Sequence, residues 1–164
     1  MRGKSKFLTQ AAMIAALYAA LCHMQNLLLP GSASWAIQFR AAESICVLSF
    51  FTPAAVPGLT IGCLLFNITS GVALPLDFLV GSLASFLAAL SMWKLRRFPA
   101  LGLWMPALLN GLLVGWELSV YIGGGFWINA LYVAIGEAGV LLTLGVLLYR
   151  MIKKQLAVAG VTTP

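Results

Sequence analysis

The stretch FWINALYVAIGEAGVLLTLGVLLYRMIKK, residues 126–154, decides the fold class. Residues 126–149 are almost entirely apolar, and the chain then turns basic at Arg150. A helix needs roughly 20 mostly apolar residues to cross the hydrocarbon core of a bilayer. Lys and Arg next to such a run are typical of the cytoplasmic end of a membrane helix. The stretch therefore predicts a transmembrane helix that ends in a cytoplasmic basic cluster.

The same pattern recurs along the whole chain. Apolar residues make up 62% of the sequence, charged residues only 9%, and the mean hydropathy is +0.99. A soluble domain carries about 25% charged residues, so lipid has to be the solvent for most of this surface. We predict an all-α integral membrane bundle over residues 1–154, followed by a flexible tail at 155–164. Its six transmembrane helices are expected at residues 7–29, 37–51, 54–68, 76–93, 100–122 and 126–149.

The basic residues predict the orientation of this bundle. Nine of the ten lie in three clusters, at residues 2–6, 94–97 and 150–154. Six crossings with a cytoplasmic N-terminus place all three clusters and the C-terminus on the cytoplasmic side, as the positive-inside rule requires. A nucleic-acid-binding groove is the weaker interpretation of the charge, because each cluster abuts an apolar run.

The other charged residues lie at or within the predicted membrane helices. They are Arg40, Glu43, Asp77, Glu117 and Glu137. An ionised side chain at such a position costs roughly 2.5–3.5 kcal/mol on insertion scales, so intramembrane charges are candidates for function. Four acids against one Arg predict an outward-facing pocket for a solute that is rich in hydrogen-bond donors or positively charged.

Neutral polar and aromatic residues accompany these charges. Asn110, Val114, Glu117 and Tyr121 share one face of the fifth helix by their spacing. Further candidates for the pocket lining are Gln38, Phe39, Asn67, Trp127 and Asn129.

Several of these residues also have a purely structural interpretation. Arg40 and Glu43 are three residues apart and could pair with each other. Asp77 fits a first-turn acid or helix cap. Asn67 fits a bridge between helices, and Trp127 fits an interfacial belt. The sequence leaves both interpretations open for each of these residues.

The first helix carries two adjacent ridges of alanines. Small residues at four-residue spacing let helices approach closely in lipid, where apolar burial gives no drive for association. Internal packing accounts for one ridge, and the second predicts a flat surface for an external helix. The ridges are Ala11, Ala15, Ala19 and Ala12, Ala16, Ala20.

Signatures of catalysis are missing from the sequence. It has no nucleotide-binding glycine loop, no zinc-protease motif, and a single His, so we expect neither an enzyme nor a cofactor or metal site. Uphill transport would need an ion gradient or energy from partner subunits.

Several segments resemble a known family. The run QFRAAE at residues 38–43, continuing through FFTPAA at 50–55, and the run WINALY at 127–132 resemble the QueT family, as do Asp77–Leu90 and Gly136-Glu137. Members of that family are the substrate-binding S components of energy-coupling factor (ECF) transporters assigned to queuosine precursors.

The resemblance implies a function and a set of partners. It implies a six-helix S component in a bacterial cell membrane, with no ATPase of its own, that topples within the bilayer during transport. It also implies docking of the alanine ridges on a transmembrane coupling (T) subunit, which in turn carries two ATPase subunits. The expected ligand is a small deazaguanine base captured at the outer face.

Each candidate residue has an expected role in binding that base. Glu43, Glu117 and Glu137 accept its donors, and Gln38, Asn67 and Asn129 complete the hydrogen bonding. Arg40 orients Glu43, while Trp127 or Phe39 stacks on the ring. Two alternatives stay open: an S component for another vitamin or planar amine, and a stand-alone proton-coupled carrier that uses Glu137 as its relay.

Overall fold

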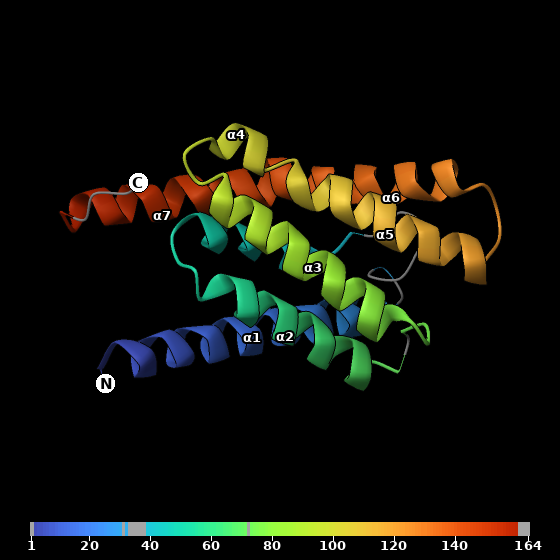
Figure 1. Cartoon of the computed structure of the whole chain (residues 1–164), viewed down its shortest axis with the longest axis horizontal. Helices are drawn as coiled ribbons and strands as arrows, with labels where there is room; N and C mark the ends of the chain where they lie inside the picture. Colours follow the sequence, from blue (N-terminus) through green and yellow to red (C-terminus); the bar gives the residue numbers. More distant parts are fainter. Residues whose placement is uncertain (1, 31, 33–38, 72, 161–164) are drawn as a thin grey trace.

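The computed structural model describes residues 2–30, 32, 39–71 and 73–160, and in these the protein is helical without strands (Figure 1). This confirms the all-helical prediction. The elements are, in chain order, α1 (Arg2–Leu28), η1 (Ala41–Phe50), α2 (Ala55–Thr69), α3 (Asp77–Lys94), α4 (Pro99–Gly102), α5 (Met105–Tyr121), α6 (Phe126–Val140), η2 (Leu141–Gly145) and α7 (Val146–Val158).

These elements form six rods within the described residues, because α4 joins α5 and α6 continues through η2 into α7. Three rods are long and apolar enough by length and composition to cross a membrane: Gly3–Leu28, Pro99–Tyr121 and Phe126–Val158. The apolar helices η1 and α2 are shorter.

The second rod differs most from its predicted form. We expected a helix over 37–51, and the structure has a 3-10 helix, η1, that starts at Ala41. Residues 37 and 38 lie outside the described residues. A 3-10 helix rises about 2.0 Å per residue, so the short η1 reaches roughly a third further than an α-helix of the same length would.

The ends of three other rods also differ from prediction. The first helix begins near residue 2 instead of 7, so Lys4 and Lys6 are helical. The fifth is interrupted between α4 and α5, where Pro106 occupies the first turn of α5, the position at which Pro is tolerated. The last helix continues to Val158, so the prediction of a flexible tail is wrong for residues 155–158.

The bundle is built around η1. Neighbouring rods pack in the order α1, α2, α3, α5, α6, while η1 contacts α1, α2, α3, α6, η2 and α7. Most of η1 is buried, including Glu43 and Cys46. Glycines let the backbones approach closely: a Cβ atom on Gly62 would lie 2.8 Å from the carbonyl oxygen of Ala15. The polar residues of η1 are thereby held in the middle of the bundle.

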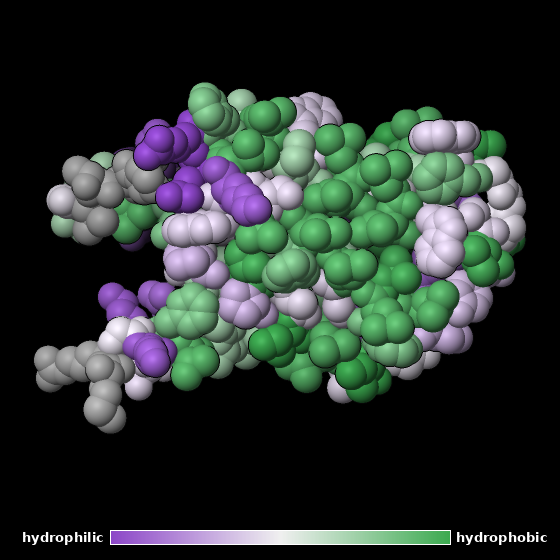
Figure 2. Space-filling view, in the orientation of Figure 1, coloured by the Kyte–Doolittle hydropathy of each residue, from purple (hydrophilic) through white to green (hydrophobic). Residues whose placement is uncertain are grey.

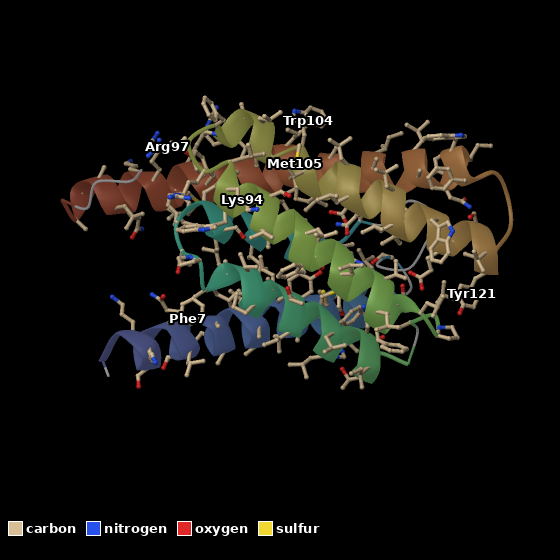
Figure 3. The ribbon with its side chains drawn as sticks, in the orientation of Figure 1. Phe7, Lys94, Arg97, Trp104, Met105 and Tyr121 are labelled. Atoms are coloured by element: carbon tan, nitrogen blue, oxygen red, sulfur yellow. The ribbon has the colours of Figure 1, made fainter. Side chains whose placement is uncertain are left out.

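The surface separates by polarity along the long axis. Hydrophilic side chains gather at the end where both termini lie, and the flank in view is mainly hydrophobic (Figure 2). Lys94 and Arg97 lie at this basic end and Tyr121 at the opposite end (Figure 3). All four acidic residues of the chain are instead buried. The structure therefore brings the three basic clusters of the sequence to one end.

Candidate functional site

Glu43 is the best-satisfied acid of the bundle. It has no solvent exposure, and the hydroxyl of Tyr18 on α1 donates a hydrogen bond to its Oε1. The Cys46 thiol lies 2.9 Å from its Oε2 as a second donor. The guanidinium of Arg40, itself only 4% exposed, interacts electrostatically with it. We call Tyr18, Arg40, Glu43 and Cys46 the Glu43 cluster.

Gln25 of α1 holds the chain that leads into this cluster. Its Oε1 accepts the Ala41 backbone N–H at 2.7 Å. Its Nε2 donates to the Phe39 carbonyl and to the Ser32 hydroxyl, the latter at 2.9 Å. Three bonds from one side chain fix the start of η1 and hence the position of Arg40 and Glu43.

Glu117 and Glu137 are buried but not satisfied. They are 0% and 1% exposed, from α5 and α6 respectively. Among the described residues, neither oxygen of Glu117 accepts a hydrogen bond, and Oε2 of Glu137 accepts none. Arg40 is the cation that acts on both. A buried polar atom without a partner costs roughly 1–3 kcal/mol, and more when it is charged.

Asp77 and Asn67 lie on the α3 side of Glu117. The Asp77 carboxyl interacts electrostatically with the Glu117 carboxyl. Asp77 Oδ2 accepts the Leu74 N–H at 2.7 Å, which agrees with its predicted place in a helix first turn. Asn67 of α2 donates to the Asp77 carbonyl at 2.6 Å, while its Oδ1 has no donor among the described residues. We call Asn67, Asp77, Glu117 and Glu137 the acceptor cluster, although Glu137 interacts with Glu43 and Arg40 of the Glu43 cluster.

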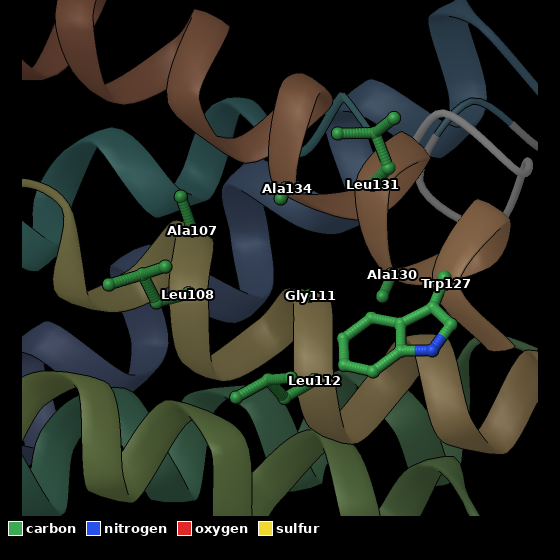
Figure 4. A pocket seen from close by; sticks show the side chains of 8 residues that line it. All are labelled: Ala107, Leu108, Gly111, Leu112, Trp127, Ala130, Leu131 and Ala134. Atoms are coloured by element: carbon green, nitrogen blue, oxygen red, sulfur yellow. The ribbon is translucent and has the colours of Figure 1, made fainter.

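Other predicted lining residues lie away from this cluster. Trp127 is 75% exposed on the outer flank of α6, and its predicted place in the pocket stays a prediction. It borders an apolar groove of about 290 Å³ between α5 and α6 (Figure 4). Asn129 donates to the Gly123 carbonyl at 3.0 Å, a bond that closes the α5–α6 turn. Gln38 lies outside the described residues.

Phe39 is partly exposed and contacts α6. Its side chain is 51% exposed, and its ring edge reaches the backbone of α6 at Gly139, where a Cβ atom would lie 3.5 Å away. Gly139 follows Glu137 by two residues. Because positions two residues apart lie on different faces of a helix, this contact places Phe39 against α6 and not against the Glu137 carboxyl.

Sequence reasoning missed several members of the site. Tyr18, Cys46, Ser82 and Ser85 are buried, and the two serine hydroxyls have no partner among the described residues. Ser85 lies eight residues after Asp77 and hence on the same face of α3, a spacing that was readable in the sequence. Tyr18 had no such signal, because nothing local shows which acid its hydroxyl reaches.

The structure separates the two alanine ridges of α1. Ala11 and Ala15 are buried, and Ala19 is half-buried on the same face. Their backbone meets Gly58 and Gly62 of α2, so this ridge is internal packing. The second ridge is exposed along its length, at Ala12, Ala16 and Ala20.

Comparison with known proteins places the chain in a family. A family model described as "QueT transporter" matches residues 8–154, which is most of the chain. The chain belongs to the QueT transporter family. QueT proteins are transporters and not enzymes. None of the curated proteins and none of the solved structures that were compared matches this chain.

Membership of the QueT family agrees with what the site can do. Two buried carboxyl groups, those of Glu117 and Glu137, interact electrostatically with the Arg40 guanidinium, and three of their oxygens have no donor among the described residues. Such a site can bind a solute that donates hydrogen bonds. As a QueT protein with three helices able to cross a bilayer, the chain is a membrane transporter.

Proposed function

We propose that this protein is the substrate-binding S component of an ECF-type importer and captures a queuosine precursor from outside the cell. The observation that supports this most is the pair of buried acids, Glu117 and Glu137, because three of their four carboxyl oxygens have no donor among the described residues. In the empty transporter such acids lower the stability of the fold, because buried polar atoms without partners are unfavourable. A solute that brings N–H groups would satisfy them.

An aminomethyl-deazaguanine base has the matching chemistry. Its ammonium group and its amino-pyrimidinone edge are both donors, and charge-assisted hydrogen bonds to carboxylates are the strong ones. We assign its donors to Glu117 and Glu137, with Asn67 completing the contacts. Phe39, in place of Trp127, stacks on the ring. Glu43 and Arg40 organise the site.

The exposed alanine ridge supports the proposed partners. Ala12, Ala16 and Ala20 line a face of α1 that no other element of the described chain covers. Small residues suit close helix contact in lipid. We assign this face to docking of the T subunit, which in turn carries two ATPase subunits. The internal ridge at Ala11 and Ala15 serves α2 instead.

The orientation in the membrane follows from the same proposal. Six rods cross the bacterial cell membrane, and the basic end with both termini faces the cytoplasm, as the positive-inside rule favours. Asp77 begins α3 and Glu117 lies near the end of α5, both toward the opposite end. The acceptor cluster then faces the outside of the cell.

Titration calorimetry on the purified chain tests the substrate. Aminomethyl-deazaguanine should give saturable heat at micromolar concentration, and Glu117→Gln should weaken or abolish it. Ser119→Ala is the matched control, because Ser119 lies on the same helix and bonds only to the Trp116 carbonyl. Saturable heat with a different vitamin or planar amine, and none with the base, would keep the S-component role and replace the substrate.

Co-purification with a T subunit tests the partner. Ala16→Leu should abolish the complex while solute binding to the isolated chain persists. Ala134→Leu, on the outer groove of α6, is the control and should leave the complex intact. Retention of the complex by Ala16→Leu would move the docking surface elsewhere.

A further inference from the structure

The basic end of the protein has no exposed acidic side chain to balance its charge. Nine of the ten basic residues lie there, and Lys94, Lys153 and Lys154 are among the exposed ones. All four acidic residues of the chain are buried inside the bundle. The positive-inside rule accounts for the cations but not for the missing acids, because acidic residues contribute little to that rule. The negative charge that balances this end therefore comes from outside the chain.

The last rod carries part of this charge past the hydrocarbon core of the membrane. It spans Phe126–Val158, which is 33 residues. At 1.5 Å per residue such a helix is roughly 50 Å long, whereas the hydrocarbon core is about 30 Å thick. With Phe126 at one boundary of the core, the other boundary is reached after roughly 20 residues, near Val146. Because α7 begins at Val146, it lies at the level of the phospholipid headgroups.

Two adjoining hollows run along one side of α7. The first has a volume of about 330 Å³ and is lined by Leu148, Met151, Ile152, Gln155 and Leu156. The second has a volume of about 500 Å³ and is lined by Met151, Lys154, Gln155 and Val158. We call the residues that line both hollows the α7 furrow. The furrow is apolar at its Leu148 end and has a cation, Lys154, toward its Val158 end.

Neighbouring cations are held against aromatic rings of the bundle. The Nζ atom of Lys153 lies 6.0 Å from the centre of the Tyr149 ring. The guanidinium of Arg96 lies 4.2 Å from the centre of the Trp93 ring and donates to the Trp93 carbonyl at 3.1 Å. Cation–π contacts of this kind orient the charged group toward the ring. Lys154 is the cation that lines the furrow instead.

From this arrangement we propose that the α7 furrow holds one anionic phospholipid, with its phosphate at Lys154 and an acyl chain along Leu148 and Met151. In the proposed orientation of the protein, this lipid belongs to the cytoplasmic leaflet. Basic residues directly beside a membrane helix attract anionic headgroups. An acidic segment of a partner protein would match the charge as well. The furrow favours a lipid, because its apolar end continues into the exposed side chains of Leu144 and Leu147 on the membrane-spanning part of the rod.

Native mass spectrometry of the purified chain counts the phospholipids that stay bound. We expect one phosphatidylglycerol to remain under conditions that remove phosphatidylcholine. Equal retention of the two lipids would overturn the proposal, because the phosphate contact would then contribute nothing beyond apolar contact. Displacement of phosphatidylglycerol by inorganic phosphate would also overturn it, since a site for a bare anion does not need the acyl chain.

Lys154→Gln tests the contact with the phosphate. This variant should weaken phosphatidylglycerol retention by about five-fold, the effect of one basic residue at an anionic membrane surface. Lys6→Gln is the matched control, because it removes the same charge from α1, on the opposite side of the basic end (Figure 1). It should leave retention unchanged. Equal losses in the two variants would show diffuse attraction to the whole basic end and refute a site on α7.

Met151→Trp tests the contact with the acyl chain. The larger side chain fills the furrow without changing the charge, so phosphatidylglycerol retention should fall. Met13→Trp, at an exposed position of α1, is the control and should retain the lipid. Wild-type retention in Met151→Trp would place the lipid elsewhere. The solute should still bind to all these variants, because none of the altered residues belongs to the acceptor cluster. Loss of solute binding alone would count against the proposed function and not against the lipid site.

Discussion

The Glu43 cluster and the acceptor cluster are neighbouring groups of buried acids with opposite hydrogen-bond status. In the first, a tyrosine hydroxyl, a thiol and a guanidinium surround one carboxylate. In the second, three oxygens of Glu117 and Glu137 have no donor among the described residues. Under the proposed function, Glu43 stabilises the bundle, and Glu117 and Glu137 bind the solute.

The largest effect on stability is expected when Glu43, the acid with two hydrogen-bond donors, is removed. Glu43→Ala should lower the free energy of unfolding by about 3–5 kcal/mol, because it leaves the buried Tyr18 hydroxyl and Cys46 thiol without their acceptor and removes a carboxylate that interacts with Arg40. Thermal unfolding in detergent measures this. Glu117→Gln is the comparison variant and should unfold at or above the wild-type temperature, since it removes an unpaired buried carboxylate. Equal losses of stability in both variants would show that Glu43 and Glu117 contribute to the fold in the same way.

The next effect concerns the solute. Glu117→Gln should weaken solute binding by about 10–100-fold, the equivalent of the 1.5–3 kcal/mol that a hydrogen bond to a charged group contributes. Calorimetric titration with aminomethyl-deazaguanine gives the affinity. A wild-type affinity in this variant, with Glu137→Gln also unaffected, would remove the acceptor cluster from the binding site.

A smaller effect is expected at Tyr18. Tyr18→Phe deletes one donor to Glu43 and should cost about 0.5–1.5 kcal/mol of stability, with solute affinity nearly unchanged. Thermal unfolding and calorimetry on the same sample separate the two. A large loss of affinity at unchanged stability would assign Glu43 to the solute and not to the scaffold.

The smallest effect is expected at Trp127. Because its side chain lies on the outer flank of α6, Trp127→Ala should change solute affinity by less than about two-fold, within the range of surface substitutions. Phe39→Ala is the paired variant and should weaken binding more. A reversal of this order, measured by calorimetry, would restore the stacking role that the sequence suggested for Trp127.

The comparison of α5 with α6 shows how well helical periodicity predicts which residues share a face. Asn110 and Glu117 are seven residues apart, about 1.9 turns, so they share a face, and both are buried. Trp127 and Glu137 are ten residues apart, about 2.8 turns, so they point in different directions. The period alone could have excluded Trp127 from the pocket.

The sequence by itself determined that lipid surrounds most of the protein and that the basic residues lie at one end of the bundle. Too few charges to wet the surface require lipid, and three basic clusters beside apolar runs require one end of the bundle to carry them, because ions are costly in hydrocarbon. Only the tertiary structure decided which buried acid finds donors. Tyr18 and Glu43 lie 25 residues apart in the chain. Which donor meets which acceptor depends on how the helices pack, and no local pattern encodes that.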